Sequence, residues 1–86
     1  METRKQPPLP EHAGDLLTAL KRLRSQLARR ANVPSYMIFS DATLEDMARK
    51  QPTTLDRLLD VKGVGNSKAH RYGHEFLDVI RMFTLE

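Results

Sequence analysis

The 86-residue sequence contains no cysteine and no tryptophan, and aromatic residues make up only 6% of it. Without cysteine it has neither a disulfide framework nor a thiolate zinc site. No apolar run approaches the roughly 20 residues of a membrane span, and no signal peptide opens the chain. A chain this short cannot form two independent cores. We therefore expect one small, soluble, monomeric domain of the cytoplasm, associated with the nucleoid if the source is bacterial.

Neither sign of charge is in large excess, since 14 Lys and Arg residues face 11 Asp and Glu residues for a net charge of +3. The cations concentrate in residues 15–30, which hold five of them against a single acid, whereas residues 41–60 carry more acids than bases. This distribution favours a weakly bound anionic partner that docks on one face. It argues against a protein that coats DNA by bulk charge.

Strand signals are missing too, and the periodicity that remains is helical. A long helix is predicted from Ala13, because apolar residues recur with helical spacing at positions 13, 16, 17, 20, 23, 27 and 31. Pro34 ends this helix, since proline disfavours the α conformation in the residue before it. A compact connector over residues 33–39, with a single helical turn, should follow.

Capping residues mark the next two helices. Ser40 and Asp41 are typical caps for a helix that runs to about Lys50. Thr53, with Asp56 three residues later, resembles a capping box. This predicts a short helix that buries three leucines: Leu55, Leu58 and Leu59.

Glycine is scarce, with four residues in the chain, and two of them flank Val64. Because glycine adopts positive φ without steric cost, Gly63 and Gly65 predict a sharp turn, with Val64 pointing into the core. A helix over residues 66–72 should follow and end at Gly73, in the position that favours left-handed geometry. A last helix would then carry Phe76, Leu77, Ile80 and Phe83.

These elements together predict an all-α bundle of five helices over residues 13–83. Residues 1–12 contain three prolines and are interpreted as a flexible lead or linker. Residues 84–86 are interpreted as a tail, and its last two residues could derive from cloning.

The turn with the two glycines also suggests a contact with phosphate. The amides of Gly65, Asn66 and Ser67 would face outward at a helix N-terminus, where partial positive charge attracts anions, and Lys68 adds a full charge. The functional interpretation is a sequence-neutral clamp on a nucleic-acid backbone, and the alternative is a helical corner whose glycines serve packing only. Longer phosphate loops are excluded, because no GxxxxGK[ST] is present and no strand precedes the glycines.

Metal binding and catalysis find little support. His70 and His74 are four residues apart, but Gly73 is expected to end the helix between them, and no third ligand has a suitable spacing. The acids between residues 41 and 60 occupy expected caps or outward faces, and no GxSxG is present. We expect no catalytic residue, no metal and no cofactor in this domain.

Tyr36 follows Pro34 in the connector, where a rigid backbone can present its ring outward. Stacking of a base on an aromatic ring contributes about 1–3 kcal/mol and tolerates any sequence. The alternative is that the ring packs beneath the connector, although Ile38 and Phe39 already supply its inward contacts. Two further cations, seven residues apart on one face of the first helix, form either a basic contact surface or a solvated face: Arg22 and Arg29.

The whole pattern resembles the HRDC domain, the helicase and RNase D C-terminal module, and is most similar to the copies in RecQ-family DNA helicases. The resemblance covers residues 14–82 and rests on segments 20–24, 33–44, 52–55 and 61–65, with Lys68, Arg71, Tyr72, Gly73 and Phe76. It implies a five-helix domain with a helix-hairpin-helix-like element, which contacts single-stranded or branched DNA while a separate motor hydrolyses ATP. By position, Tyr36 corresponds to the connector aromatic of some members, and Lys62, Lys68 and Arg71 lie on the basic rim of the turn.

The chain departs from the family pattern at two positions. Ser35 replaces a frequent second proline, which loosens the connector, and His70 stands where an acid is frequent, which leaves Lys68 and Arg71 less neutralised. The second change favours phosphate contact.

The sequence therefore predicts a non-catalytic, nucleic-acid-binding accessory domain of a RecQ-like ATP-dependent DNA helicase of DNA repair and recombination, with ATP and magnesium confined to the parent motor. Two alternatives remain: a positioning domain that docks on the parent enzyme, and an accessory domain of an RNase-D-like exonuclease. The predicted contacts to DNA are Tyr36, Lys62, Gly63, Val64, Gly65, Asn66, Lys68, Arg71, Arg22 and Arg29.

Overall fold

The computed structural model describes residues 13–84, so the predictions for residues 1–12 and 85–86 lie outside it. The described chain forms α1 (Ala13–Ala31), a 3₁₀ turn η1 (Ser35–Met37), α2 (Asp41–Lys50), α3 (Leu55–Leu58) and α4 (Asn66–Thr84). Residues 13–84 contain no strand, which confirms the all-α prediction. None of these helices is both long enough and apolar enough to cross a membrane.

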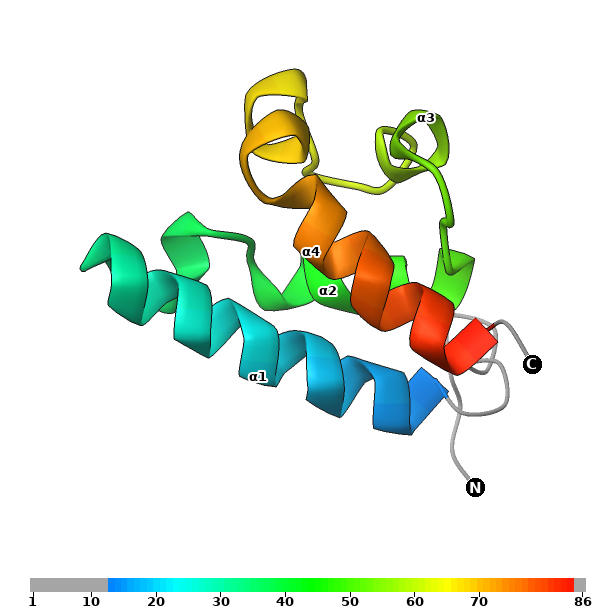
Figure 1. Ribbon diagram of the computed structural model, residues 1–86, viewed down its shortest axis with the longest axis horizontal. Helices are drawn as coiled ribbons and strands as arrows, with labels where there is room; N and C mark the ends of the chain where they lie inside the picture. Colours follow the sequence, from blue (N-terminus) through cyan, green and yellow to red (C-terminus); the bar gives the residue numbers. More distant parts are fainter. Residues whose placement is uncertain (1–12, 85–86) are drawn as a thin grey trace.

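The three longer helices, α1, α2 and α4, enclose the core (Figure 1). α1 lies along one side, α4 and α2 pack above it, and α3 packs against α4. Phe39 and Phe76 meet edge to face at the centre, with ring centroids 5.1 Å apart. Around them are buried Leu16, Leu20, Ile38, Leu44, Met47, Leu77 and Ile80.

α1 ends as the sequence predicts, just before Pro34. Asn32 adopts a left-handed backbone with φ of 57°. The Val33 N–H donates to the carbonyl of Ala28 at 3.0 Å, and the Asn32 N–H donates to that of Arg29 at 3.1 Å. This pair of bonds is the Schellman closure, which satisfies two of the carbonyls left open at a helix C-terminus.

The connector leaves α1 and buries its last two residues, Ile38 and Phe39, as predicted. Arg24 fastens it to α1: its Nη1 donates to the carbonyl of Phe39 at 3.0 Å and lies 2.8 Å from the carboxylate of Asp41. The hydrogen bond from Arg24 and its charge hold the pKa of Asp41 below its usual range.

Caps define α2 and α3, with one difference from the prediction. The Ser40 hydroxyl accepts the N–H of Thr43, as expected for the α2 cap. At α3 the cap is Thr54 rather than Thr53, because Thr54 has the extended backbone that lets its Oγ1 accept the Arg57 N–H at 3.2 Å. The inward orientation predicted for Leu59 is wrong: this residue follows α3, and 38% of it is exposed.

α4 is one continuous helix of 19 residues, where the sequence predicts two helices separated at Gly73. The described chain therefore has four α-helices instead of five. Gly73 is helical and buried, and a Cβ there would lie 2.8 Å from Leu55 Cδ2 and 3.1 Å from Leu58 Cδ2. The absence of a side chain at Gly73 therefore allows α3 to pack closely on α4, and the residue does not end a helix.

The far end of α4 is fastened to the segment between α2 and α3. The guanidinium of Arg81 donates two hydrogen bonds to the carbonyl of Thr53, at 3.2 and 2.8 Å. α4 therefore contacts α3 at Gly73 and the preceding segment at Arg81, and both contacts hold the segment between α2 and the glycine turn against one helix.

Candidate nucleic-acid interface

The glycine turn, residues 59–65, joins α3 to α4 and anchors itself through two buried valines, Val61 and Val64. The inward position predicted for Val64 is confirmed. Its side chain belongs to the core, so only its backbone is available to a ligand. Gly63 has φ of 83° and is the only glycine of residues 13–84 with positive φ. The prediction that Gly65 also needs this conformation is therefore wrong.

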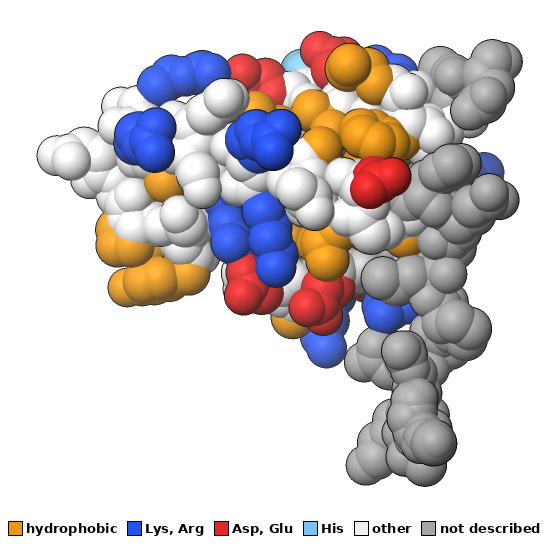
Figure 2. All heavy atoms as spheres, turned by 90° about the horizontal axis from the view of Figure 1, so that it is seen from below, with side chains coloured by type: hydrophobic (Ala, Val, Ile, Leu, Met, Phe, Trp, Pro, Cys, Tyr) orange, Lys and Arg blue, Asp and Glu red, His pale blue; other side chains and the backbone are white. Residues whose placement is uncertain are grey.

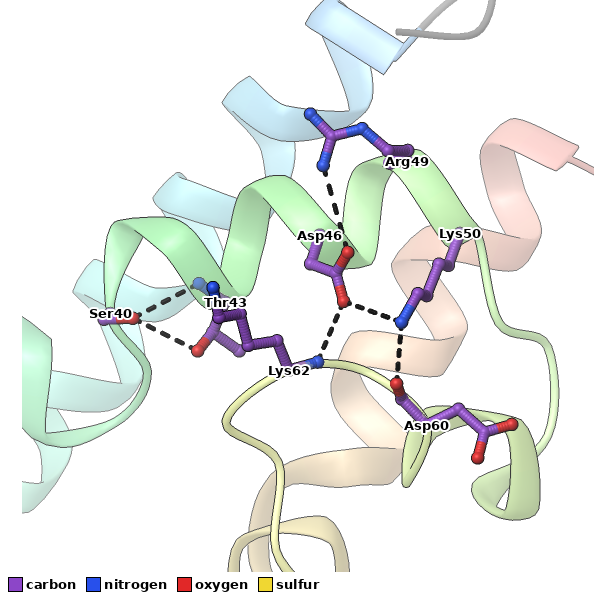
Figure 3. A network of polar contacts seen from close by, with 7 residues as sticks. All are labelled: Ser40, Thr43, Asp46, Arg49, Lys50, Asp60 and Lys62. Carbon is purple, nitrogen blue, oxygen red and sulfur yellow. Dashed lines mark hydrogen bonds and ion pairs between the residues drawn. The ribbon is translucent and has the colours of Figure 1, made fainter. Parts of the chain in front are cut away.

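The turn is held against α2 at two places. At Gly63 the backbone comes so close that a Cβ would lie 2.3 Å from Thr43 Oγ1. One residue earlier, the Lys62 N–H donates to the carboxylate of Asp46 at 2.8 Å (Figure 3). Positive φ and close approach thus both require glycine at position 63.

Asp46 is the centre of this contact. Its carboxylate lies 3.0 Å from Lys50 Nζ and 3.9 Å from Arg49 Nη1, and Lys50 also donates to the carbonyl of Asp60 in the turn. Burial raises the pKa of Asp46, but the hydrogen bonds from the Lys62 N–H and Lys50, with the charges of Lys50 and Arg49, outweigh it and lower that pKa.

Fixing the turn leaves the start of α4 open. Gly65 is exposed, and a Cβ there would meet no atom within 4 Å. α4 begins at Asn66 and has no acid in its first turn. A shallow concavity of about 430 Å³ lies here, lined by Asn66, Ser67, His70 and Arg71. Backbone N–H groups at such an end carry partial positive charge, which Arg71 supplements.

Lys68 connects the start of α4 to the connector. It is half-buried, and its Nζ lies 5.9 Å from the centroid of the Phe39 ring, a cation–π distance. Phe39 is the last residue of the connector that carries Tyr36. Lys62, by contrast, is exposed, and only its backbone is bonded to Asp46.

The histidines differ from the prediction in one respect. Because α4 is continuous, His70 and His74 lie four residues apart on one helix instead of being separated by a helix end. His70 Nδ1 lies 2.9 Å from the carbonyl of Asn66. No group of three potential metal ligands exists within residues 13–84.

Tyr36 projects from η1 into solvent, with 70% of the residue exposed. The alternative that its ring packs beneath the connector is wrong, because Ile38 and Phe39 fill that space. Met37 beside it is 50% exposed. Between α1 and this connector lies a second shallow concavity of about 570 Å³, lined by Ser25, Ala28, Arg29, Asn32, Val33, Pro34 and Ser35.

The predicted basic face of α1 is also present. Arg22 and Arg29 are both exposed, while Arg30 lies 3.5 Å from Glu75 of α4. Figure 2 looks onto the side that α1 covers and shows Lys and Arg side chains gathered over the half of the molecule nearer η1, with acids among them. The face is therefore mixed in charge and not a continuous basic surface.

The structure thus arranges the predicted site residues in two groups. One surrounds the start of α4: Lys62, Gly63, Val64, Gly65, Asn66, Lys68 and Arg71. The other group comprises Tyr36 with Arg22 and Arg29. The cation–π contact of Lys68 with Phe39 links the first group to the connector that carries Tyr36. Sequence reasoning missed Thr43 and Asp46, whose contacts with the glycine turn no motif encodes. It also missed the role of Asn32, although asparagine just after a helix favours the left-handed backbone found here.

Residues 13–84 thus form a small helical module with an anchored glycine turn, an open start of α4 and an exposed aromatic ring on η1. The family model for the HRDC domain matches residues 13–80. This chain belongs to the HRDC family.

The chain is similar to segments of larger helicases. It is 40% identical over 73 residues to the ATP-dependent DNA helicase RecQ of Pasteurella multocida, covering 85% of this chain and 12% of that protein. It is 37% identical over 67 residues to the ATP-dependent DNA helicase UvrD2 of Mycobacterium bovis, covering 78% and 10%. The chain also superposes on a solved structure, D. radiodurans RecQ HRDC domain 3, with a TM-score of 0.83 at 36% identity, covering 88% of this chain and 100% of that one.

Proposed function

We propose that this chain is a DNA-binding accessory domain of an ATP-dependent DNA helicase of the RecQ type, with no catalysis of its own. The observation that carries this proposal is the exposed Tyr36 ring on the same domain as the open start of α4, in a chain whose relatives are DNA helicases. The chain spans only 12% of the RecQ relative, so ATP hydrolysis and magnesium binding would belong to the rest of such a protein.

Single-stranded or forked DNA is the substrate that fits these surfaces. A ring in solvent can stack on an unpaired base of any sequence, and the α4 start with Lys62, Lys68 and Arg71 can contact phosphates without reading bases. The small number of cations predicts weak binding, with a dissociation constant of about micromolar order or above. In a larger protein, tethering would raise the effective concentration of such a weak site.

Titration of labelled single-stranded DNA at several salt concentrations tests this proposal. We expect the logarithm of affinity to fall with the logarithm of salt, by about 0.7 for each phosphate neutralised. Replacing Lys62 and Lys68 by alanine should lower that slope by about 1.4, while Arg57→Ala on the exposed side of α3 should leave it almost unchanged. Absence of binding at low salt, or binding that salt does not affect, would contradict the proposal.

Docking on a protein partner is the second candidate, because Met37 and Met82 are 50% and 78% exposed. Amide chemical shifts discriminate the two: the docking function predicts shifts on addition of the helicase motor and none with DNA. An RNase-D-like context predicts instead a higher affinity for RNA than for DNA of the same sequence.

A further inference from the structure

We propose that the concavity between the end of α1 and the connector holds an unpaired nucleobase. We call it the α1-end concavity. Its volume is about 570 Å³, and its lining residues are Ser25, Ala28, Arg29, Asn32, Val33, Pro34 and Ser35. The inference rests on the proposed function, since the base belongs to a bound single strand, and it specifies which part of that strand is bound here.

The lining suits a flat ligand with apolar faces and polar edges. Ala28, Val33 and Pro34 supply apolar surface, and the polar side chains are those of Ser25, Arg29, Asn32 and Ser35. Ligand concavities of roughly 300–1,000 Å³ typically combine apolar walls with a few polar groups in this way. Unpaired bases are bound by stacking on planar side chains, including the guanidinium of arginine, and by hydrogen bonds along their edges.

The direction of α1 favours a base over a phosphate. The concavity lies at the C-terminal end of this helix, where the open carbonyls carry partial negative charge. A phosphate only accepts hydrogen bonds and could form an ion pair here with Arg29 alone, whereas the amino groups of adenine, cytosine and guanine can also donate to such carbonyl acceptors. The concavity at the start of α4 has the opposite polarity and suits phosphate.

The α1-end concavity lies next to Tyr36, where a single strand of DNA would pass. Ser35 lines the concavity and is followed directly by Tyr36, whose ring is 70% exposed. A strand that stacks one base on Tyr36 therefore has its neighbouring base beside the concavity. The carboxamide of Asn32 can both donate and accept, as the edge of a base requires.

Asn32→Gly is the decisive variant, because glycine keeps the left-handed backbone, φ of 57°, and removes only the side chain. Gln51→Gly is the matched control, since Gln51 has φ of 50° at the end of α2 and lies outside the α1-end concavity. We expect Asn32→Gly to weaken binding of a single-stranded oligonucleotide by about fivefold or more, and Gln51→Gly to leave it within twofold. Urea unfolding of both variants controls for stability.

An oligonucleotide with abasic positions provides the second arm. The wild-type domain should bind it several-fold more weakly than the base-bearing strand, and this difference should shrink in Asn32→Gly. Amide signals of residues 25–35 should shift with the base-bearing strand. Binding of both strands with equal affinity, or binding without shifts at residues 25–35, overturns the nucleobase site and leaves the proposed function intact. Absence of all binding at low salt overturns both.

Discussion

Gly63 and Gly65 occupy different environments, although only Val64 separates them. Gly63 combines φ of 83° with a contact to Thr43 Oγ1 so close that a Cβ would lie 2.3 Å away. Gly65 faces open space without positive φ. Only the first glycine is therefore required by the geometry of the turn.

Alanine substitution at each glycine tests this difference. Gly63→Ala should lower the free energy of unfolding by about 2–4 kcal/mol, because it adds backbone strain and a clash with Thr43. Gly65→Ala should cost less than about 1 kcal/mol, as expected for a change at an exposed helix cap. Urea unfolding measures both values, and equal losses in the two variants would contradict this account.

The candidate site was predictable from sequence where a residue acts through its own type and neighbours. Tyr36, two residues after a proline, is exposed, which is one of the two orientations that the sequence left open, and Val64 lies between glycines and is buried, as predicted. Asp46 was assigned to an outward face, because its hydrogen bond to the Lys62 N–H joins residues 16 positions apart. No local pattern encodes such a contact.

At the scale of elements, the main contact is that of the glycine turn with α2. Asp46 and Lys50 on α2 bond to the backbone at Lys62 and Asp60 (Figure 3). The orientation of the start of α4 relative to α2 therefore depends on the carboxylate of Asp46, which is not itself one of the proposed phosphate contacts.

Two substitutions of Asp46 separate its hydrogen bond from its charge. Asp46→Ala removes the acceptor and should lower stability by about 1–3 kcal/mol and speed hydrogen exchange of the Lys62 amide. Asp46→Asn keeps an acceptor and should protect that amide better than Asp46→Ala. Glu45→Ala, at the exposed neighbouring position, is the control. Unchanged exchange at Lys62 in Asp46→Ala would contradict the role.

Helix boundaries were predictable where local signals decide them. Pro34 ends α1 and Ser40 caps α2, because each acts on backbone groups within a few residues. Gly73 was misassigned for the opposite reason. A glycine indicates a helix end only when no tertiary contact needs its small size, and here Leu55 and Leu58 of α3 pack on it.

For the whole molecule, the lowered pKa values of Asp41 and Asp46 link stability to acid pH. Both are held below the ordinary value of 3.8 in the folded state. A carboxyl with a depressed folded-state pKa contributes stability above its unfolded pKa and loses it as pH falls through the folded value. Stability should therefore decline below about pH 4, and Asp41, at 66% side-chain exposure, should contribute little.

Urea unfolding of the wild type and Asp46→Asn at pH 7, 5, 3.5 and 2.5 checks this linkage. The wild type should be the more stable of the two at pH 5 and above. Their difference should shrink as pH falls below 4, because the wild-type carboxyl becomes neutral like the amide. If the difference in the free energy of unfolding between the two proteins stayed constant down to pH 2.5, the charge of Asp46 would contribute nothing to stability.

The all-α architecture followed from composition and period, since the apolar positions of α1, α2 and α4 recur with helical spacing. The relative placement of the helices did not, because it depends on Phe39, Phe76 and the contacts that fasten the turn, which join distant parts of the chain.

Both ends of the described chain lie at the same end of the molecule. In Figure 1 the first residue of α1 and the last of α4 lie at one extremity of the long axis, and η1 lies at the other. A pull between a flanking chain segment and a strand bound near η1 would run lengthwise along the packed helices. Such shear loads many side-chain contacts at once instead of peeling them apart singly. For a load applied through the end of α4, the contacts of this helix with α1 would therefore share the force, and the helix would not be peeled away from one end.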